Sequence, residues 1–127
     1  MGTHYTVTLA MLVGFGLGAV AVQGLHAQSK APVYQITEID VTDQEGYAKN
    51  YVSRIVPALK EAGARFIVQA GKTYPFEGEP PKRIVVLTWD SIEKAQAFRD
   101  SAAGKELQLV RDKYAKFRSF AVEGLPQ

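Results

Sequence analysis

The sequence predicts an α+β fold, with a four-stranded antiparallel sheet and two helical regions behind an N-terminal export segment. Three observations support this prediction: four short runs rich in β-branched and aromatic residues, two stretches with apolar residues at helical spacing, and an N-terminal apolar segment without charges. The chain has 127 residues, which suits one domain, because a single hydrophobic core commonly occupies about 100 to 150 residues.

The N-terminal segment has the features of an export signal. Residues 5–27 contain no Lys, Arg, Asp or Glu, a pattern typical of a secretory signal peptide, with Ala27 as its expected last residue. The apolar run from Val7 to Val22 is short for a membrane span, which needs roughly 20 residues. We expect a signal peptide over residues 1–27; an uncleaved helical anchor and an unrelated segment are the alternatives.

The rest of the chain then divides into a linker over residues 28–32 and a domain over residues 33–124. Export would place the domain in the periplasm or outside the cell. An uncleaved leader would instead hold it at the inner membrane, facing the periplasm. Membrane contact is expected only through such a leader.

Composition excludes several kinds of chemistry from the domain. Both histidines (His4 and His26) and both methionines (Met1 and Met11) precede residue 28, and the chain has no Cys. The domain therefore lacks the customary zinc and copper ligands, a histidine for haem, and the Ser-His-Asp and Cys-His catalytic sets. We expect no metal and no cofactor. The net charge of +2 is spread along the chain without a basic stripe, so nucleic-acid binding is not expected.

The first predicted strand is VYQITEIDV at 33–41, which has apolar residues on both faces. A helix is expected to follow, because Thr42 and Glu45 have the spacing of a capping box. Apolar residues then recur at helical period: Tyr47, Ala48, Tyr51, Val52, Ile55, Val56 and Leu59. Pro57 is expected to kink the last turns, and Gly63 to end the helix.

Three more strands are predicted, over residues 64–71, 82–89 and 116–123. The first two of these should pair antiparallel, because the connection between them is too short for a crossover helix. That connection contains Glu77 and Glu79, which form either a carboxylate pair for chemistry or part of a turn. The Gly and Pro residues beside them favour a plain hairpin.

A second helical region is predicted between the last two strands. Asp90 or Ser91 is expected to cap it. Its inward-facing residues are expected to be Ile92, Ala95, Phe98 and Ala102, followed by Leu107, Val110 and Tyr114. Gly104 should interrupt the region and divide it into two helical pieces.

The order β-α-β-β-α-β is that of a ferredoxin-like fold, in which the helices cover only one face of the sheet. The strand at 82–89 nevertheless has apolar residues on both faces, since Arg83, Val85, Leu87 and Trp89 alternate with Ile84, Val86 and Thr88. An uncovered apolar sheet would be an exposed patch. We therefore expect a second copy of the chain to cover it in a homodimer.

Five stretches have a characteristic order and spacing: YQITEIDVTD, Gly63-Ala64-Arg65, the Glu77-Gly78 turn, RIVVLTWDS and the closing FAVEG. Together they resemble the DUF1330 family of uncharacterised small bacterial proteins over residues 33–124, and the leader resembles that of an exported subgroup. The resemblance implies a dimeric α+β barrel and supplies no activity. The family usually has Gly where Ala64 stands and Tyr where Gly104 stands, which implies a cavity of a different shape.

Arg65 is the first candidate for ligand binding. It starts a strand directly after a helix stop, where its guanidinium can bind a carboxylate or phosphate. The alternative is an ion pair with Glu38 or another acid of the domain. Glu38 itself is a candidate general base, because an inner strand can raise the pKa of a carboxyl group. Arg83 and Arg118 are similarly open to a binding role or to plain solvation at a sheet edge.

Tyr34 and Trp89 are candidates to line an aromatic cavity, together with Tyr47 and Tyr51. The helical spacing of Tyr47 and Tyr51 favours core packing over ligand contact.

Two functional hypotheses follow from these features. The first is an exported homodimer that binds a small apolar or acidic ligand, or a partner, at the inter-subunit barrel. The second is a cofactor-independent enzyme, monooxygenase-like or isomerase-like, that uses a shielded barrel cavity, a hypothesis that rests on analogy of fold.

Overall fold

The computed structural model describes residues 31–126, and residues 32–124 form one folded unit. The leader expected over residues 1–27, and most of the linker, lie outside the described residues. None of the helices within residues 31–126 combines the length and the apolar content that crossing a bilayer requires.

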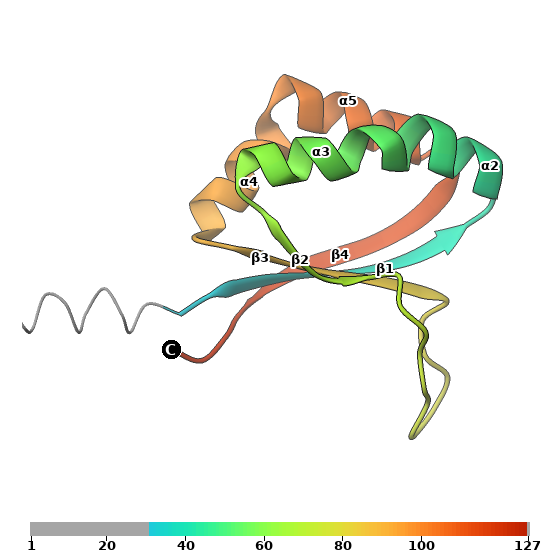
Figure 1. Cartoon of the computed structure of the whole chain (residues 1–127), viewed down its shortest axis with the longest axis horizontal. Helices are drawn as coiled ribbons and strands as arrows, with labels where there is room; N and C mark the ends of the chain where they lie inside the picture. The colour runs from blue at the N-terminus through green and yellow to red at the C-terminus, as the bar shows by residue number, and fades with distance from the viewer. Residues whose placement is uncertain (1–30, 127) are drawn as a thin grey trace, which may run out of the picture. The chain divides into compact units, whose positions relative to one another are not determined.

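The sheet confirms the α+β, ferredoxin-like prediction. Its strands lie in the order β2-β3-β1-β4, and every neighbouring pair is antiparallel. Their bounds are β1 Val33–Val41, β2 Arg65–Gln69, β3 Arg83–Trp89 and β4 Ala115–Glu123. All helices of residues 31–126 lie over one face of this sheet, and no helix of this part of the chain covers the opposite face (Figure 1). The predicted strands agree with these bounds to within two residues at each end.

The first helical region runs without a break from residue 44 to residue 62, through α2 (Gln44–Gly46), η1 (Tyr47–Val52) and α3 (Ser53–Ala62). Asp43 caps its N-terminus, with a carboxylate oxygen accepting a hydrogen bond of 3.1 Å from the Gly46 N–H. The prediction that Thr42 caps this helix was therefore wrong by one residue. The Thr42 hydroxyl instead donates a hydrogen bond of 2.9 Å to the carbonyl oxygen of Tyr114, just before β4.

The η1 segment is a π-helix, which the sequence did not predict. Its wider turn is visible in the Ser53 N–H, which bonds to the carbonyl oxygen of Ala48 five residues earlier. The two buried residues of η1 are Tyr47 and Tyr51. Pro57 lies inside α3, which continues to Ala62, and Gly63 ends the region with a φ of 106°, as predicted.

The second helical region consists of α4 (Ile92–Asp100) and α5 (Ala102–Arg111). Ser91 caps α4, its hydroxyl oxygen accepting from the Lys94 N–H at 3.2 Å. The break between the helices is at Ser101, which has an extended backbone with φ −67° and ψ 159° and caps α5 by accepting from the Gly104 N–H at 3.0 Å.

The prediction that Gly104 interrupts the helical region was therefore wrong. Gly104 lies buried inside α5, where a Cβ atom would collide with the carbonyl oxygen of Phe98 in α4. The glycine is needed for the close approach of α5 to the end of α4. Ile92 and Ala102 were expected to face inward, and both are exposed.

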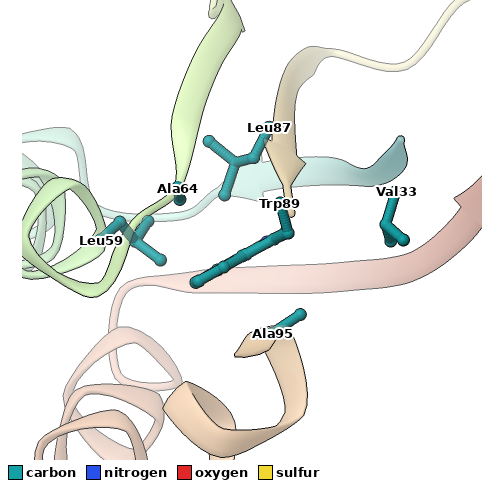
Figure 2. Close-up of a cluster of buried hydrophobic side chains, with 6 residues drawn as sticks. All are labelled: Val33, Leu59, Ala64, Leu87, Trp89 and Ala95. Carbon is teal, nitrogen blue, oxygen red and sulfur yellow. The ribbon is translucent and has the colours of Figure 1, made fainter. Parts of the chain in front are cut away.

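The core between the helices and the sheet has two clusters that join through Ile55 and Val85. The first cluster surrounds Trp89, with Val33, Leu59, Ala64, Leu87 and Ala95 gathered around its indole ring (Figure 2). The second consists of Ile39, Tyr47, Tyr51, Leu107 and Ala115. Residues of β1 at odd positions face these clusters, and those at even positions face the side without helices.

The helix-free face of the sheet is largely apolar, which confirms the expectation of apolar residues on both faces. In the centre of the sheet, the strand register places Ile36 of β1 between Val86 of β3 and Phe120 of β4. Phe120 is 44% exposed and its neighbour on the same face, Val122, is 46% exposed. We call this surface the open sheet face.

Candidate functional site

The structure separates Trp89 from the other predicted site residues. Trp89 lies on the helix side of the sheet with 2% of its surface exposed. Its indole N–H donates a hydrogen bond of 2.9 Å to Oε1 of Gln35, and its ring lies 6.2 Å from that of Phe98. Trp89 is therefore a core residue with a satisfied polar atom.

The other three predicted site residues lie on the open sheet face. Arg65 in β2 and Tyr34 in β1 both pair with Thr88 of β3, so they flank the same position. Glu38 lies two rows further along the sheet, where Arg118 Nη1 donates to its Oε2 at 3.1 Å. The proposed ion pair between Arg65 and Glu38 is thus not formed. None of these three residues lines the cavity on the helix side of the sheet.

The connection between β2 and β3 is a hairpin, as favoured by the sequence. Glu77 and Glu79 are both exposed, and Gly78 between them has a φ of 71°. This left-handed backbone conformation is typical of a turn glycine. Both carboxylates are open to solvent, so the turn offers no shielded environment for a catalytic carboxylate pair.

A cavity of about 340 Å³ lies on the other side of the sheet, between β1, β3 and β4 and the helical regions of the same chain. Its volume falls within the range of small-molecule sites, roughly 300 to 1,000 Å³. Much of its wall is apolar, from Ile55, Leu59, Phe66, Leu87, Phe98 and Leu107.

The sheet contributes a polar strip to the floor of this cavity. Gln35, Thr37 and Ser119 all line it. The Gln35 amide donates to the Ser119 hydroxyl at 3.1 Å, and the hydroxyls of Thr37 and Ser119 are 2.9 Å apart. With Trp89 donating to Gln35, these groups satisfy one another and hold the floor rigid.

The tyrosines and arginines of the cavity wall are Tyr47, Tyr51, Arg83, Arg99 and Arg111. The Arg83 guanidinium lies over the Tyr47 ring, 5.4 Å from its centroid, and Nη2 donates to Oε1 of Gln44 at 3.2 Å. The Arg111 guanidinium lies 4.6 Å from the centre of the Phe117 ring. The rings of Tyr47 and Tyr51 are 5.4 Å apart. We call these five residues the arginine–tyrosine cluster.

Burial shifts both tyrosines of the cluster towards the protonated form. Desolvation raises the pKa of Tyr47, and the positive charges of Arg83 and Arg111 oppose this effect. Desolvation likewise raises the pKa of Tyr51 to about 12, against the opposing charges of Arg111 and Arg99. Both phenols therefore carry their protons at neutral pH and are able to donate hydrogen bonds into the cavity.

Sequence reasoning named Tyr47, Tyr51 and Arg83 as candidates without placing them together, and it missed Arg99 and Arg111. Arg83 is in phase with the core-facing residues of its strand, but the opposite face is equally apolar, so alternation did not show which face the helices cover. Arg111 follows Leu107 by one helical turn and thus lies on the buried side of α5. An arginine on an apolar helical stripe was the signal that was available.

No group of three or more His, Cys, Asp and Glu side chains within residues 31–126 is arranged to hold a metal ion. The polar groups that the cavity offers are instead guanidinium groups, phenols, hydroxyls and amides. Such groups bind an organic molecule by hydrogen bonds and charge.

Comparison with known proteins identifies a family and related folds. A family model described as a domain of unknown function, DUF1330, matches residues 32–125. No curated protein matches the chain. One similar solved structure is the RPA0582 protein of unknown function from Rhodopseudomonas palustris, which is 14% identical with a TM-score of 0.64, over 86% of this chain and 94% of that chain. The structure of methylated RPA0582 is 14% identical with a TM-score of 0.63, over 84% of this chain and 90% of that chain.

A more distant structure is a dimeric ferredoxin-like protein of unknown function from Thermobifida fusca. It is 13% identical with a TM-score of 0.41, over 73% of this chain and 92% of that chain. The two RPA0582 structures support the fold of this chain, and they supply no activity.

Proposed function

The chain belongs to the DUF1330 family of domains of unknown function, and we propose that it binds a small, largely apolar molecule in the cavity between its sheet and its helices. The single observation that carries this proposal is the cavity of about 340 Å³ inside a domain of this size. The cavity is partly open to solvent. A concave space of this volume with a mixed polar and apolar wall is typical of a ligand site.

The proposed site differs in place from the one that the sequence suggested. The sequence hypothesis put the ligand at a barrel between two subunits. The cavity lies instead within one chain, on the helix side of the sheet, and is lined by residues of that chain. Each copy of the chain would then have a complete site.

We further propose that two copies pair through the open sheet face, where Ile36, Val86 and Phe120 form the central row. The segment between β2 and β3 extends from the sheet on the side away from the helices (Figure 1). At its end, Phe76 is 98% exposed and Tyr74 is 72% exposed. Large exposed aromatic residues next to an apolar sheet face are typical of a protein interface.

Export of the protein, with or without cleavage of the leader, stays a prediction from residues 1–27. N-terminal sequencing of the protein recovered from its own host tests it directly. A mature N-terminus near residue 28 would support cleavage.

Binding in the cavity is tested with a neutral fluorescent probe, N-phenyl-1-naphthylamine, whose emission increases in apolar surroundings. We expect saturable emission with the purified protein. Replacing Leu107, which is buried in α5 and lines the cavity, by Trp should fill the space and abolish the signal. Leu109 is 70% exposed on the same helix, so Leu109→Trp is the matched control and should bind normally.

Two outcomes are decisive for this proposal. Loss of probe binding in Leu107→Trp, with an unchanged circular dichroism spectrum, places the ligand in the cavity. Equal binding by both folded variants would show that the probe binds elsewhere, and the proposal would be wrong. Turnover of a bound compound would favour the enzyme hypothesis over plain binding.

A further inference from the structure

We infer that the natural ligand of the cavity is an organic anion, a carboxylate on an apolar body, whose acid group lies beside Arg99, Arg111 and Tyr51. The inference rests on the proposed ligand-binding function of the cavity and adds the chemical class of the ligand. It comes from the distribution of charge around the cavity wall.

The cavity wall has an unbalanced charge. Three arginines line it, Arg83, Arg99 and Arg111, and no Asp or Glu does. Among the described residues, no carboxylate forms a salt bridge with Arg83 or Arg99. Arg111 has one ionic partner, Asp112, at 3.2 Å. The Asp112 side chain is 61% exposed, so this charge lies at the surface and not in the cavity.

The acidic residues near these arginines in the sequence have partners outside the cavity. Asp100 follows Arg99, and its carboxylate accepts from the amide of Gln96 on the exposed side of α4 at 3.1 Å. Glu106 of α5 pairs with Arg54 of α3 at 2.9 Å, and both side chains are about half exposed. The fold therefore leaves the positive charge of the cavity without an internal counter-ion.

A desolvated guanidinium without a counter-ion is unfavourable. Arg83 and Arg99 are half-buried and have no carboxylate partner among the described residues. The Arg111 side chain is only 17% exposed, and its ionic partner is the exposed carboxylate of Asp112. An anion that enters the cavity would neutralise part of this charge. Guanidinium groups bind carboxylates with two parallel hydrogen bonds, so a carboxylate is a natural partner for them.

The tyrosines of the arginine–tyrosine cluster also favour the binding of an anion. The side chain of Tyr51 is close enough to Arg111 and Arg99 for both to lower its pKa, although burial outweighs them. Since the phenol stays protonated at neutral pH, it is able to donate a hydrogen bond to a carboxylate oxygen that also meets the arginines. Two guanidinium groups and a phenol in the wall of one cavity are suited to bind an oxyanion.

The rest of the wall determines the body of the ligand. Leu59, Phe66, Leu87 and Phe98 line the part of the cavity that adjoins the first core cluster. The arginine–tyrosine cluster adjoins the second core cluster, where Tyr47 and Tyr51 lie. The cavity wall thus combines charged groups with a large apolar surface, which fits a molecule with one acid group and a hydrocarbon or aromatic body.

The test compares two compounds that differ only in the acid group, 4-phenylbutyrate and 4-phenylbutan-1-ol. Each is titrated against the protein loaded with N-phenyl-1-naphthylamine, and displacement of the probe gives its affinity. We expect the acid to bind about 10- to 100-fold more tightly than the alcohol, the range for hydrogen bonds to charged groups. Inorganic phosphate, which lacks an apolar body, should not displace the probe.

Substitutions then identify the groups that recognise the acid. Arg99→Met keeps the length of the side chain and removes its charge, so the preference for the acid should fall about tenfold while the alcohol binds as before. Tyr51→Phe, which keeps the ring in place, should also reduce acid binding selectively. Arg54→Met, in the exposed pair with Glu106, is the control and should change neither affinity.

Each outcome bears on one of the two proposals. If the alcohol binds as tightly as the acid, or if Arg99→Met and Tyr51→Phe both leave the preference unchanged, the carboxylate inference is wrong while the proposed function stands. If the probe itself does not bind, the proposed function fails and the inference fails with it. Displacement by phosphate alone would show a site for free oxyanions and would also overturn the inference.

Discussion

Replacement of Gly104 by Ala is the sharpest test of how α4 and α5 pack. A Cβ atom at this position would collide with the carbonyl oxygen of Phe98 and would lie 3.2 Å from that of Arg99. Both obstacles are backbone atoms at the end of α4, so no side-chain rotation relieves the contact. Overpacking of this kind commonly costs about 1 to 3 kcal/mol.

The collision competes with an intrinsic gain, because Ala is favoured over Gly within a helix by about 0.8 to 1.0 kcal/mol. For a backbone collision we expect the cost to prevail and the free energy of unfolding to fall by about 1 to 2 kcal/mol. In a domain of this size, each 1 kcal/mol lowers Tm by about 4 to 8 °C. Urea unfolding followed by circular dichroism measures the change.

The control for this experiment is Ala103→Gly, since Ala103 is the exposed neighbour of Gly104 in α5. It reports the local difference between Gly and Ala without any collision. If Gly104 were merely a helical position, Gly104→Ala would stabilise the protein by about as much as Ala103→Gly destabilises it. An increased free energy of unfolding in Gly104→Ala would refute the close approach of the two helices.

Three further predictions follow from the structure. Val86→Lys on the open sheet face should weaken the proposed homodimer at least 100-fold, because it buries an unpaired charge, and it should leave the monomer folded. Sedimentation across a concentration range measures the association, and an unchanged dimer would contradict the proposed interface. Gly63→Ala should cost about 1 to 2 kcal/mol in urea unfolding from its φ of 106° alone, so an unchanged midpoint would argue against that conformation. The pKa of Tyr51 is raised to about 12 by burial, so between about pH 10 and pH 12 the unfolded chain loses this proton first and the free energy of unfolding falls. Tyr51→Phe should remove that part of the decrease, and the same pH dependence of unfolding in Tyr51→Phe and in the unchanged protein would mean that Tyr51 is not buried.

The order of the elements could be predicted because local patterns determine it. Each strand is a short β-branched run, and Gly63 stands where a left-handed residue ends the first helical region. The errors occur where contact with a distant part of the chain determines the local structure. Thr42 has a good capping side chain, yet its hydroxyl bonds to Tyr114, which is 72 residues away, and Asp43 caps the helix instead. Gly104 is a glycine because of contact with α4, which no local pattern shows.

The candidate site was harder to predict for a related reason. Both faces of the central strands are apolar, so the sequence did not show which face the helices cover. Arg65, Glu38, Tyr34 and Trp89 were grouped in one proposed ligand site, whereas Trp89 lies in the core and the other three lie on the open sheet face. Arg83 was left open between a binding role and solvation at a sheet edge, and it lies in the cavity wall. The packed structure is needed to decide whether a charged residue at the end of an apolar run lies at a sheet edge or in a cavity wall.

The sheet keeps the two proposed functional surfaces apart. Residues at odd positions of β1, such as Thr37, face the cavity, while those at even positions, such as Ile36, face the proposed partner. Neighbouring residues of one strand thus belong to different surfaces, and a substitution on one face contacts the other only through the backbone. Effects of distant, independent sites are commonly additive. Val86→Lys should therefore change the association of two copies without changing the preference of the cavity for acids, and Arg99→Met should do the reverse. If either variant changed both properties, the two surfaces would be coupled, and the ligand site would extend to the subunit interface as the sequence first suggested.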